Sequence, residues 1–380
     1  MQLVGELYER QYGRVVAALV RMLGAARLDW AEEFAQDALL RALEVWPFRG
    51  VPPNPEAWLI TTAKRLAIDR LRREKLPVEP LLLEEKPAVD DRLAMIFLCC
   101  HASLSEDLQI ALTLQAVCGL NARQIARGLM LPESTVAQRL VRAKRRLRDA
   151  GARFDEQGQL DSVLAVLYLL FNEGYAVTES ASGWFHADLC HEAIYLARLL
   201  ARRPDAHALL ALFLLQASRL PARVNEAGEA VPLQEQDRAL WDRPLLGEGF
   251  AHLERSATGG AVTAYHIEAE IAAVHAAAPS FAATDWARIA RLYAQLPPSP
   301  AVRLNHAIAI GYRDGAAAGL AALDGLAHPG HLLAATRAEF ARQLGRAADA
   351  SAHYDAALAA ARTDAERRYL ARRRDMLEEQ

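Results

Sequence analysis

Apolar residues spaced three and four apart recur along nearly the whole chain, and this spacing restricts the fold more than any other feature. In one segment, four such residues follow one another at intervals of four, three and four: Val136, Leu140, Ala143 and Leu147. This period places apolar side chains on one side of an α-helix. Runs of alternating β-branched residues, which would indicate strands, are not evident. The sequence therefore predicts an all-α fold.

Proline-bearing and glycine-bearing stretches divide the helical segments into blocks. Segment 76–90, LPVEPLLLEEKPAVD, contains three prolines, which interrupt helices and favour extended backbone. Fully extended, it would reach about 50 Å at about 3.3 Å per residue. We therefore predict a helical domain over residues 1–75, a linker over 76–90, a second helical domain over 91–150 and a long helical region over 160–380.

Positive charge is concentrated in one short part of the chain. Residues 121–150 hold eight Lys or Arg against two acidic residues, a balance of +6. The whole chain carries −3, so the remainder carries −9. This asymmetry predicts a polyanionic partner for that part of the chain and not for the whole of it.

The overall composition indicates a soluble globular protein. Hydrophobic residues make up 52% and charged residues 24% of the 380 residues. The longest apolar run is too short to span a bilayer, and the N-terminus lacks the apolar core of a secretion signal. The four cysteines form no disulfide or metal pattern. We therefore expect a cytoplasmic protein without membrane association, metal or cofactor.

The basic segment has the pattern of a helix-turn-helix. A short helix over ARQIARG is followed by a turn, and Pro132 and Ser134 suit the first turn of the next helix. The outer face of that second helix is rich in Arg. A helix of this kind fits the major groove, where Arg pairs with guanine edges and Gln with adenine edges. A solvated charged helix is the alternative, and spacing alone does not separate the two.

The first block presents an acidic helix and a basic helix. Segment 29–46, DWAEEFAQDALLRALEVW, has five acidic residues against Arg41 alone. Segment 55–75, PEAWLITTAKRLAIDRLRREK, ends in a series of Lys and Arg. Carboxylates can meet basic groups on a protein partner, and the cations can meet phosphates.

In this order, the two blocks and their linker resemble the extracytoplasmic-function (ECF) sigma factors of bacterial RNA polymerase. The resemblance covers roughly residues 1–150. It implies a first domain that docks on the β′ clamp helices of the polymerase and recognises the −10 promoter element (region 2). It implies a second domain that reads the −35 element and touches the β flap (region 4). The implied partners are core RNA polymerase and promoter DNA, and the implied protein is not an enzyme.

The resemblance assigns roles to residues by their matching positions. The expected polymerase-binding residues are Glu33, Gln36, Asp37 and Arg41. The expected −10 residues are Lys64, Arg65, Asp69, Arg72 and Arg73. The expected −35 residues are Ser134, Thr135, Gln138, Arg139, Arg142, Arg145 and Arg146. Among the −10 residues, Arg65 matches the position that reads an unstacked base, whereas Trp58 is expected to pack in the core.

The region after residue 160 reads as an array of helical hairpins. Ala350, Tyr354 and Ala357 follow the small, large, small spacing of the second helix of a tetratricopeptide-like (TPR-like) repeat. Weaker echoes lie at Ala316, Leu320 and Leu323, and at Ala193, Ala197 and Leu200. Such arrays bind proteins or ligands, so a regulatory protein or ligand is a further candidate partner.

A subgroup of ECF sigma factors carries a TPR-like extension, and FNEGY (Phe171–Tyr175) resembles part of its signature. From the residues alone this motif is a helix end, where Asn172 and Gly174 can adopt a left-handed cap.

Two other functions fit some of these features. One is a helix-turn-helix transcription regulator that does not replace the main sigma factor. The acidic helix argues against this function. The other is a TPR-like adaptor whose sigma domains are vestigial.

Overall fold

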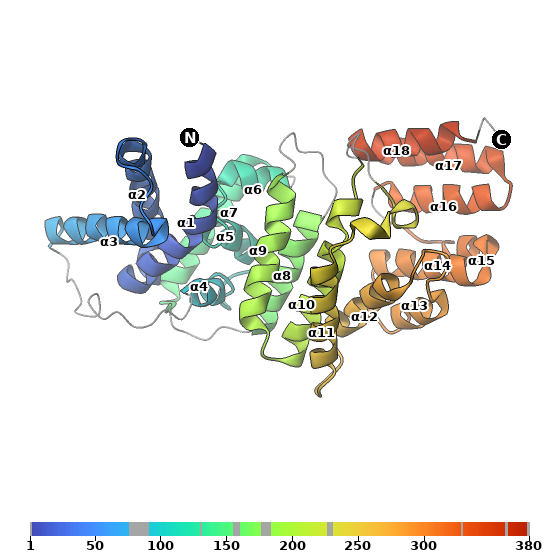
Figure 1. Cartoon of the computed structure of the whole chain (residues 1–380), viewed down its shortest axis with the longest axis horizontal. Helices are drawn as coiled ribbons and strands as arrows, with labels where there is room; N and C mark the ends of the chain where they lie inside the picture. The colour runs from blue at the N-terminus through green and yellow to red at the C-terminus, as the bar shows by residue number, and fades with distance from the viewer. Residues whose placement is uncertain are drawn as a thin grey trace. The chain divides into compact units, whose positions relative to one another are not determined.

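The structure is a computed structural model that describes residues 2–75, 91–129, 131–154, 160–175, 184–225, 231–327, 330–361 and 364–377. The described residues form helices and no strand, which confirms the all-α prediction (Figure 1). They divide into two compact units, Met1–Glu173 and Gly174–Gln380. The predicted domains 1–75 and 91–150 both belong to the first unit. The predicted linker, 76–90, lies outside the described residues.

The first three long helices of the first unit pack against one another. Gly24 and Gly50 have φ values of 80° and 79°, a backbone that favours glycine, and they separate the helices. Asn54 caps the third helix by accepting a hydrogen bond from the backbone N–H of Ala57 at 3.0 Å. The elements are α1 (Gln2–Leu23), η1 (Ala25–Arg27), α2 (Leu28–Arg49) and α3 (Pro55–Arg73).

The rest of the first unit begins with four shorter helices. Asn121 and Gln124 cap one of them reciprocally, because each backbone N–H donates to the other side chain at 2.9 Å. An apolar helix follows and leads to the end of the unit. These elements are α4 (Asp91–Cys99), α5 (Glu106–Ala116), α6 (Ala122–Gly128), α7 (Glu133–Asp149) and α8 (Leu160–Tyr175).

The second unit consists of successive helices in which chain neighbours pack together. Asp242, Asp285 and Ser299 each cap the N-terminus of the helix that follows them. The first helices are α9 (Trp184–Leu200), α10 (Pro204–Ala217), α11 (Arg243–Ser256) and α12 (Ala264–Ala277), with η3 (Leu220–Ala222), η4 (Leu233–Glu235) and η5 (Arg238–Leu240) between α10 and α11. The last are α13 (Trp286–Tyr293), α14 (Pro300–Asp314), α15 (Ala316–Ala322), α16 (Leu332–Gln343), α17 (Ala347–Ala360) and α18 (Asp364–Asp375).

The expected small and large positions of the hairpins lie in the core of the second unit. Ala350, Tyr354 and Ala357 on α17 are buried, and α17 packs on α16. Phe340 of α16 fills the space left by two glycines, Gly311 on α14 and Gly319 on α15. The glycines therefore let three helices approach one ring.

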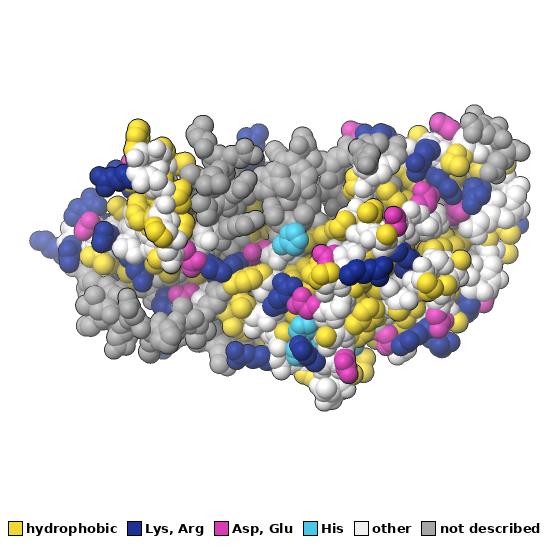
Figure 2. Space-filling model, in the orientation of Figure 1, with side chains coloured by type: hydrophobic (Ala, Val, Ile, Leu, Met, Phe, Trp, Pro, Cys, Tyr) yellow, Lys and Arg dark blue, Asp and Glu magenta, His cyan; other side chains and the backbone are white. Residues whose placement is uncertain are grey.

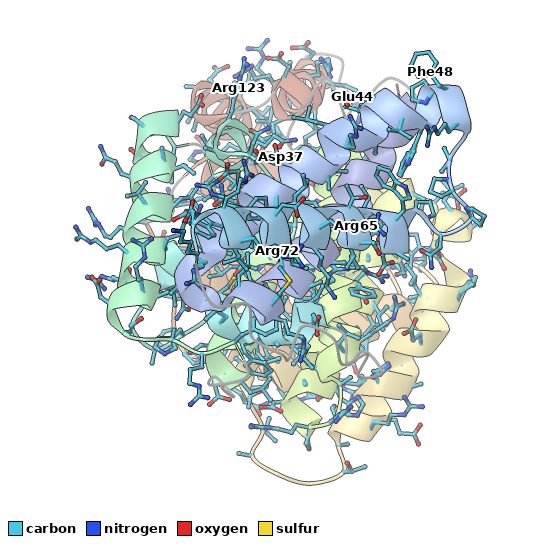
Figure 3. The ribbon with its side chains drawn as sticks, turned by 90° about the vertical axis from the view of Figure 1, so that its left-hand side faces the viewer. Asp37, Glu44, Phe48, Arg65, Arg72 and Arg123 are labelled. Carbon is cyan, nitrogen blue, oxygen red and sulfur yellow. The ribbon has the colours of Figure 1, made fainter. Side chains whose placement is uncertain are left out.

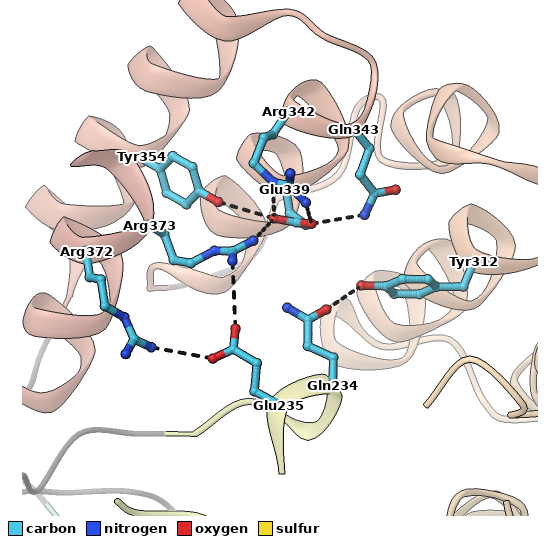
Figure 4. A network of polar contacts seen from close by, with 9 residues as sticks. All are labelled: Gln234, Glu235, Tyr312, Glu339, Arg342, Gln343, Tyr354, Arg372 and Arg373. Atoms are coloured by element: carbon cyan, nitrogen blue, oxygen red, sulfur yellow. Dashed lines mark hydrogen bonds and ion pairs between the residues drawn. The ribbon is translucent and has the colours of Figure 1, made fainter. Parts of the chain in front are cut away.

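A polar network holds the last helices together (Figure 4). The Glu339 carboxylate accepts hydrogen bonds from Arg342 at 2.7 Å, from Arg373 at 2.6 Å and from Gln343 at 3.1 Å. Burial opposes the charged form, but these donors outweigh it and lower the pKa of Glu339 to about 2. Arg373 also lies 3.7 Å from Glu235, so α18 is tied to α16 and to the segment that precedes α11.

No helix among the described residues combines the length and the apolar character needed to cross a membrane. Over the same residues, no group of three or more His, Cys, Asp or Glu side chains could hold a metal ion.

The glycine packing generates a stability prediction. A Cβ added at Gly311 would lie 2.2 Å from Cζ of Phe340, whereas one at Gly247, also within a helix, would meet nothing within 4 Å. We expect Gly311→Ala to lower the free energy of unfolding by about 1–3 kcal/mol because of overpacking. We expect the control Gly247→Ala to leave it unchanged or raise it by up to about 1 kcal/mol through helix propensity. Urea unfolding measures both, and equal effects would contradict the packing described.

A partly buried histidine, His275, makes the second unit sensitive to acid. Burial, reinforced by Arg219 and Arg238, lowers the pKa of His275 to about 4 from 6.5. The folded state therefore favours neutral His275, and this contribution to stability is present above pH 6.5 and lost as the pH falls toward 4. Between these values we expect His275→Gln to flatten the decline of unfolding free energy by up to about 1.4 kcal/mol per pH unit. Urea titrations at several pH values measure the slope, and an unchanged slope would contradict the assignment.

Candidate nucleic-acid and protein interface

Helix α7 turns a basic face outward because its apolar stripe is buried. Val136, Leu140, Ala143 and Leu147 are all buried, as the spacing predicted. Five of the expected −35 residues are exposed: Ser134, Gln138, Arg142, Arg145 and Arg146. The other two, Thr135 and Arg139, are partly buried. Since α6 packs against α7 across a short turn, the pair has the arrangement of a helix-turn-helix.

Two of these side chains have partners within their own domain. Arg139 lies 3.3 Å from a carboxylate oxygen of Asp107, at the start of α5. A hydrogen bond from Ser105, together with the charge of Arg139, lowers the pKa of Asp107. Arg146 donates to the backbone oxygen of Ser103 at 3.2 Å. In the described part of the chain, Arg142 and Arg145 have no hydrogen-bond or ion-pair partner, so their guanidinium groups are available to an anion.

Helix α3 presents a second basic face. Its buried stripe consists of Leu59, Ala63, Ala67 and Leu71. Four of the expected −10 residues are exposed, namely Arg65, Asp69, Arg72 and Arg73, and Lys64 is partly buried. Figure 2 shows Lys and Arg side chains gathered over the outer end of α3, and Figure 3 shows Arg65 and Arg72 along this helix.

The four expected polymerase-binding residues share an exposed face of α2. Glu33, Gln36, Asp37 and Arg41 are all exposed, and Figure 3 shows Asp37 and Glu44 along the helix. Arg41 pairs with Glu44 at 2.8 Å. Glu33 pairs at 2.9 Å with Arg70 of α3, which ties this face to the basic helix.

Sequence reasoning missed an apolar component of the same surface. Leu40, Leu43 and Phe48 are 58%, 41% and 89% exposed, and Figure 2 shows hydrophobic side chains over α2. These residues lie at intervals of three and five, outside the buried stripe of the helix. The sequence did contain a signal for this surface, because the segment that forms α2 has more apolar residues than one buried stripe can contain. Exposed apolar groups rimmed by charges are typical of a protein-binding surface.

Trp58 and the FNEGY motif, both noted in the sequence, contribute to the packing of the structure. Trp58 packs edge-on against the buried Trp46 with ring centroids 5.4 Å apart, but it is only partly buried itself, so it lies at the edge of the core. The FNEGY motif forms the end of α8, as expected. The left-handed cap at Asn172 or Gly174 is wrong, because α8 continues through both residues to Tyr175 and neither has a positive φ. The Arg223 guanidinium lies over the ring of Tyr175, with its Cζ atom 3.7 Å from the ring centroid.

Three parts of the chain match known families. Residues 7–76 match Sigma-70 region 2, residues 94–147 match Sigma-70 region 4, and residues 159–257 match a family of unknown function, DUF6596. Helices α2 and α3 lie in the first match, and α6 and most of α7 lie in the second. These domains define a sigma factor of the ECF type.

A relative covers nearly the whole chain. An uncharacterized protein of Rhizobium meliloti (strain 1021) is 38% identical over 96% of this chain and 95% of its own length. No solved structure matches the chain. The chain belongs to the ECF-like sigma factors that carry a C-terminal DUF6596 extension.

The outward face of α7 generates a DNA-binding prediction. If Arg142 pairs with a base of the −35 element, Arg142→Ala should weaken binding of that element by about 1–3 kcal/mol. Arg346→Ala removes the same charge from an exposed position of the second unit and should leave binding unchanged. Competition binding of cognate and scrambled duplexes by the holoenzyme measures both. An equal loss on both duplexes, with a shallower salt dependence, would instead make Arg142 a phosphate contact.

Proposed function

We propose that this protein binds core RNA polymerase, directs it to promoters through −10 and −35 contacts, and is controlled by its C-terminal extension. The observation that carries the proposal is that one chain presents three exposed faces, on α2, α3 and α7, within the two sigma domains. The protein would act in the cytoplasm as an initiation factor without enzymatic activity of its own.

The face of α2 suits the β′ clamp helices of the polymerase. Asp37 and Gln36 are exposed and would supply polar contacts. Leu40 and Leu43 would supply apolar surface that is removed from water when the two proteins bind. A surface with an apolar centre and charged rim gives both affinity and orientation. A DNA-binding regulator that works without replacing the main sigma factor has no need of this face, so its exposure favours the sigma factor.

The face of α3 suits an opened −10 element. Reading a base there requires its extrusion from the stack, which costs a few kcal/mol and calls for stacking and hydrogen-bonding groups. Arg65 would bond the base edge, and Lys64, Arg72 and Arg73 would hold phosphates. Phe48, exposed just before the loop that leads into α3, offers a ring on which an unstacked base can stack.

The face of α7 suits duplex DNA at the −35 element. Gln138 and Arg142 are exposed near the middle of the helix, where base edges of the major groove would lie. Arg145 and Arg146, further along, would meet the phosphate backbone, and region 4 would also touch the β flap.

The extension would control initiation as a helical module of the protein-binding type. It could act by packing on the sigma domains or the polymerase, or by receiving a regulatory protein or ligand. Deleting residues 160–380 and measuring run-off transcription from a cognate promoter tests this role. We expect altered output or lost response to the inducing condition. Unchanged output and response, in a truncated protein that still binds core enzyme, would remove the extension from the proposal.

A charge reversal tests the polymerase-binding face. We expect Asp37→Arg to weaken the complex with core polymerase about tenfold or more, because the new cation would face basic groups on the polymerase. Asp324→Arg makes the same change at an exposed position of the second unit and is the control. Fluorescence anisotropy of labelled protein with core enzyme measures the affinities, and an unaffected Asp37→Arg variant would exclude this face.

A further inference from the structure

Three partly buried arginines near the end of the chain each pair with a carboxylate. Arg342, Arg373 and Arg374 lie within 3.1 Å of a carboxylate oxygen, and Figure 4 shows the first two at Glu339. Such pairing is expected, because a guanidinium group that leaves water without a counter-charge loses favourable hydration. Three other partly buried arginines of the second unit have no carboxylate partner among the described residues. We call them the arginine cluster: Arg219, Arg223 and Arg238.

Two members of the arginine cluster meet at one buried ring. The Cζ atoms of Arg238 and Arg219 lie 4.5 Å and 5.6 Å from the ring centroid of Trp241, a residue that is 3% exposed. The face of an indole ring attracts a cation and offsets part of its lost hydration. The ring carries no net negative charge, so the two guanidinium groups still repel each other. Burial and the charge of Arg219 accordingly lower the pKa of Arg238.

The charge of Arg219 also acts on Arg223 and His275. Arg223 lies over the Tyr175 ring with its Cζ atom 3.7 Å from the centroid, and it donates to the Tyr175 backbone oxygen. Burial, with a further contribution from Arg219, lowers the pKa of Arg223, and Tyr175 opposes this only in part. Burial and the charges of Arg219 and Arg238 lower the pKa of His275 to about 4. The region therefore holds three cations beside a neutral histidine at neutral pH.

Hydrogen-bond donors without acceptors occur at the same place. The Nη2 atom of Arg238 and the Nε1 atom of Trp241 are buried and have no hydrogen-bond partner in the described part of the chain. Both groups are donors only, and buried donors are rarely left unpaired in proteins. The other terminal nitrogen of Arg238, Nη1, donates at 2.8 Å to the backbone oxygens of His275 and Ala278. These two bonds fix the guanidinium group in place before any ligand binds.

An oxyanion would satisfy both the unpaired donors and the uncompensated charge. Its oxygens accept hydrogen bonds, and its negative charge reduces the repulsion among the guanidinium groups. The planar fork of a guanidinium group matches the oxygens of phosphate and carboxylate groups, which is why Arg is the common residue at such sites. Three cations around one site favour a doubly charged phosphate over a singly charged carboxylate.

We propose that the arginine cluster and the indole N–H of Trp241 bind an oxyanion, the phosphate or carboxylate group of a small ligand. All four residues lie within residues 159–257, which match DUF6596, so the site gives this extension a class of ligand. Arg219 follows α10, whereas Arg238 lies in η5 and contacts the end of α12. The bound anion would therefore join these three elements. The site is independent of the proposed function, because it would bind its ligand whether or not the protein acts as a sigma factor.

Isothermal titration calorimetry of the full-length protein measures the binding. The probes are sodium phosphate and sodium acetate, with sodium chloride at the same ionic strength as the control. We expect saturable binding of phosphate with a Kd of about 1 mM or below, weaker binding of acetate, and none of chloride. Acetate binding tighter than phosphate binding would assign the site to a carboxylate ligand.

Two variants with different chemistry test the residues. Arg219→Gln removes the charge that acts on the other two arginines, and Trp241→Phe keeps an aromatic ring but removes the N–H. We expect each to weaken phosphate binding about tenfold or more. The matched control is Arg337→Gln, which should leave phosphate binding unchanged. Arg337 is a partly buried arginine of α16 that donates to the backbone oxygen of Leu323 at 3.0 Å.

Thermal unfolding in chloride establishes that each variant is folded, and Arg219→Gln decides the question should Trp241→Phe unfold. The proposal would be overturned if neither anion bound saturably, or if wild type and Arg219→Gln bound phosphate equally. Glu226 and Glu229 lie in segment 226–230, outside the described residues, so a variant with both changed to Gln is also titrated. Binding in this variant alone would show that the chain supplies its own anion, and would likewise overturn the proposal. Since no polymerase is present, loss of this site and loss of the proposed function are separate results.

Discussion

The burial of one apolar stripe on each helix is the constraint on which the functional surfaces depend. In α7 and α3 these stripes fix the rotation of the helix, because Leu140 and Leu59 have no other place to be buried. The basic side chains are then forced to the opposite faces, whatever their own interactions. In α2 the same constraint leaves Asp37 beside exposed Leu40 and Leu43, and so produces a mixed charged and apolar face. Packing of the core therefore decides which side chains are exposed on each of these faces.

Much of this could be predicted from sequence, because helical periodicity is a local property. The stripe of Val136, Leu140, Ala143 and Leu147 predicted the orientation of α7 correctly, and the residues that the resemblance assigned to α2 and α3 are exposed apart from Lys64. The backbone conformation of the FNEGY motif was predicted wrongly. Its asparagine and glycine tolerate a left-handed backbone, yet the helix continues through them to Tyr175, whose ring Arg223 covers. Local preference was overridden there by the surrounding structure.

Contacts between distant parts of the chain could not be predicted. Nothing in the sequence near Lys144 indicates a pairing with Glu32, 112 residues earlier. A glycine at position 13, inside a helix, is by itself only a weak helix former. In the structure, the backbone oxygen of Val117 occupies the space that a side chain at position 13 would fill. The glycine is therefore needed for packing and not for helix formation. The packing of α5 and α7 against α1 and α2 thus depends on pairings that one sequence does not reveal, whereas the exposed faces depend on periodicity that it does.

In the proposed function, one chain both binds core polymerase and selects the site at which transcription starts. Run-off transcription with core polymerase, purified full-length protein and genomic fragments tests that claim most directly. The account predicts transcripts with defined start sites that require the added protein and disappear when it is omitted. The account would be contradicted if no fragment gave a transcript and the folded protein also failed to co-migrate with core enzyme.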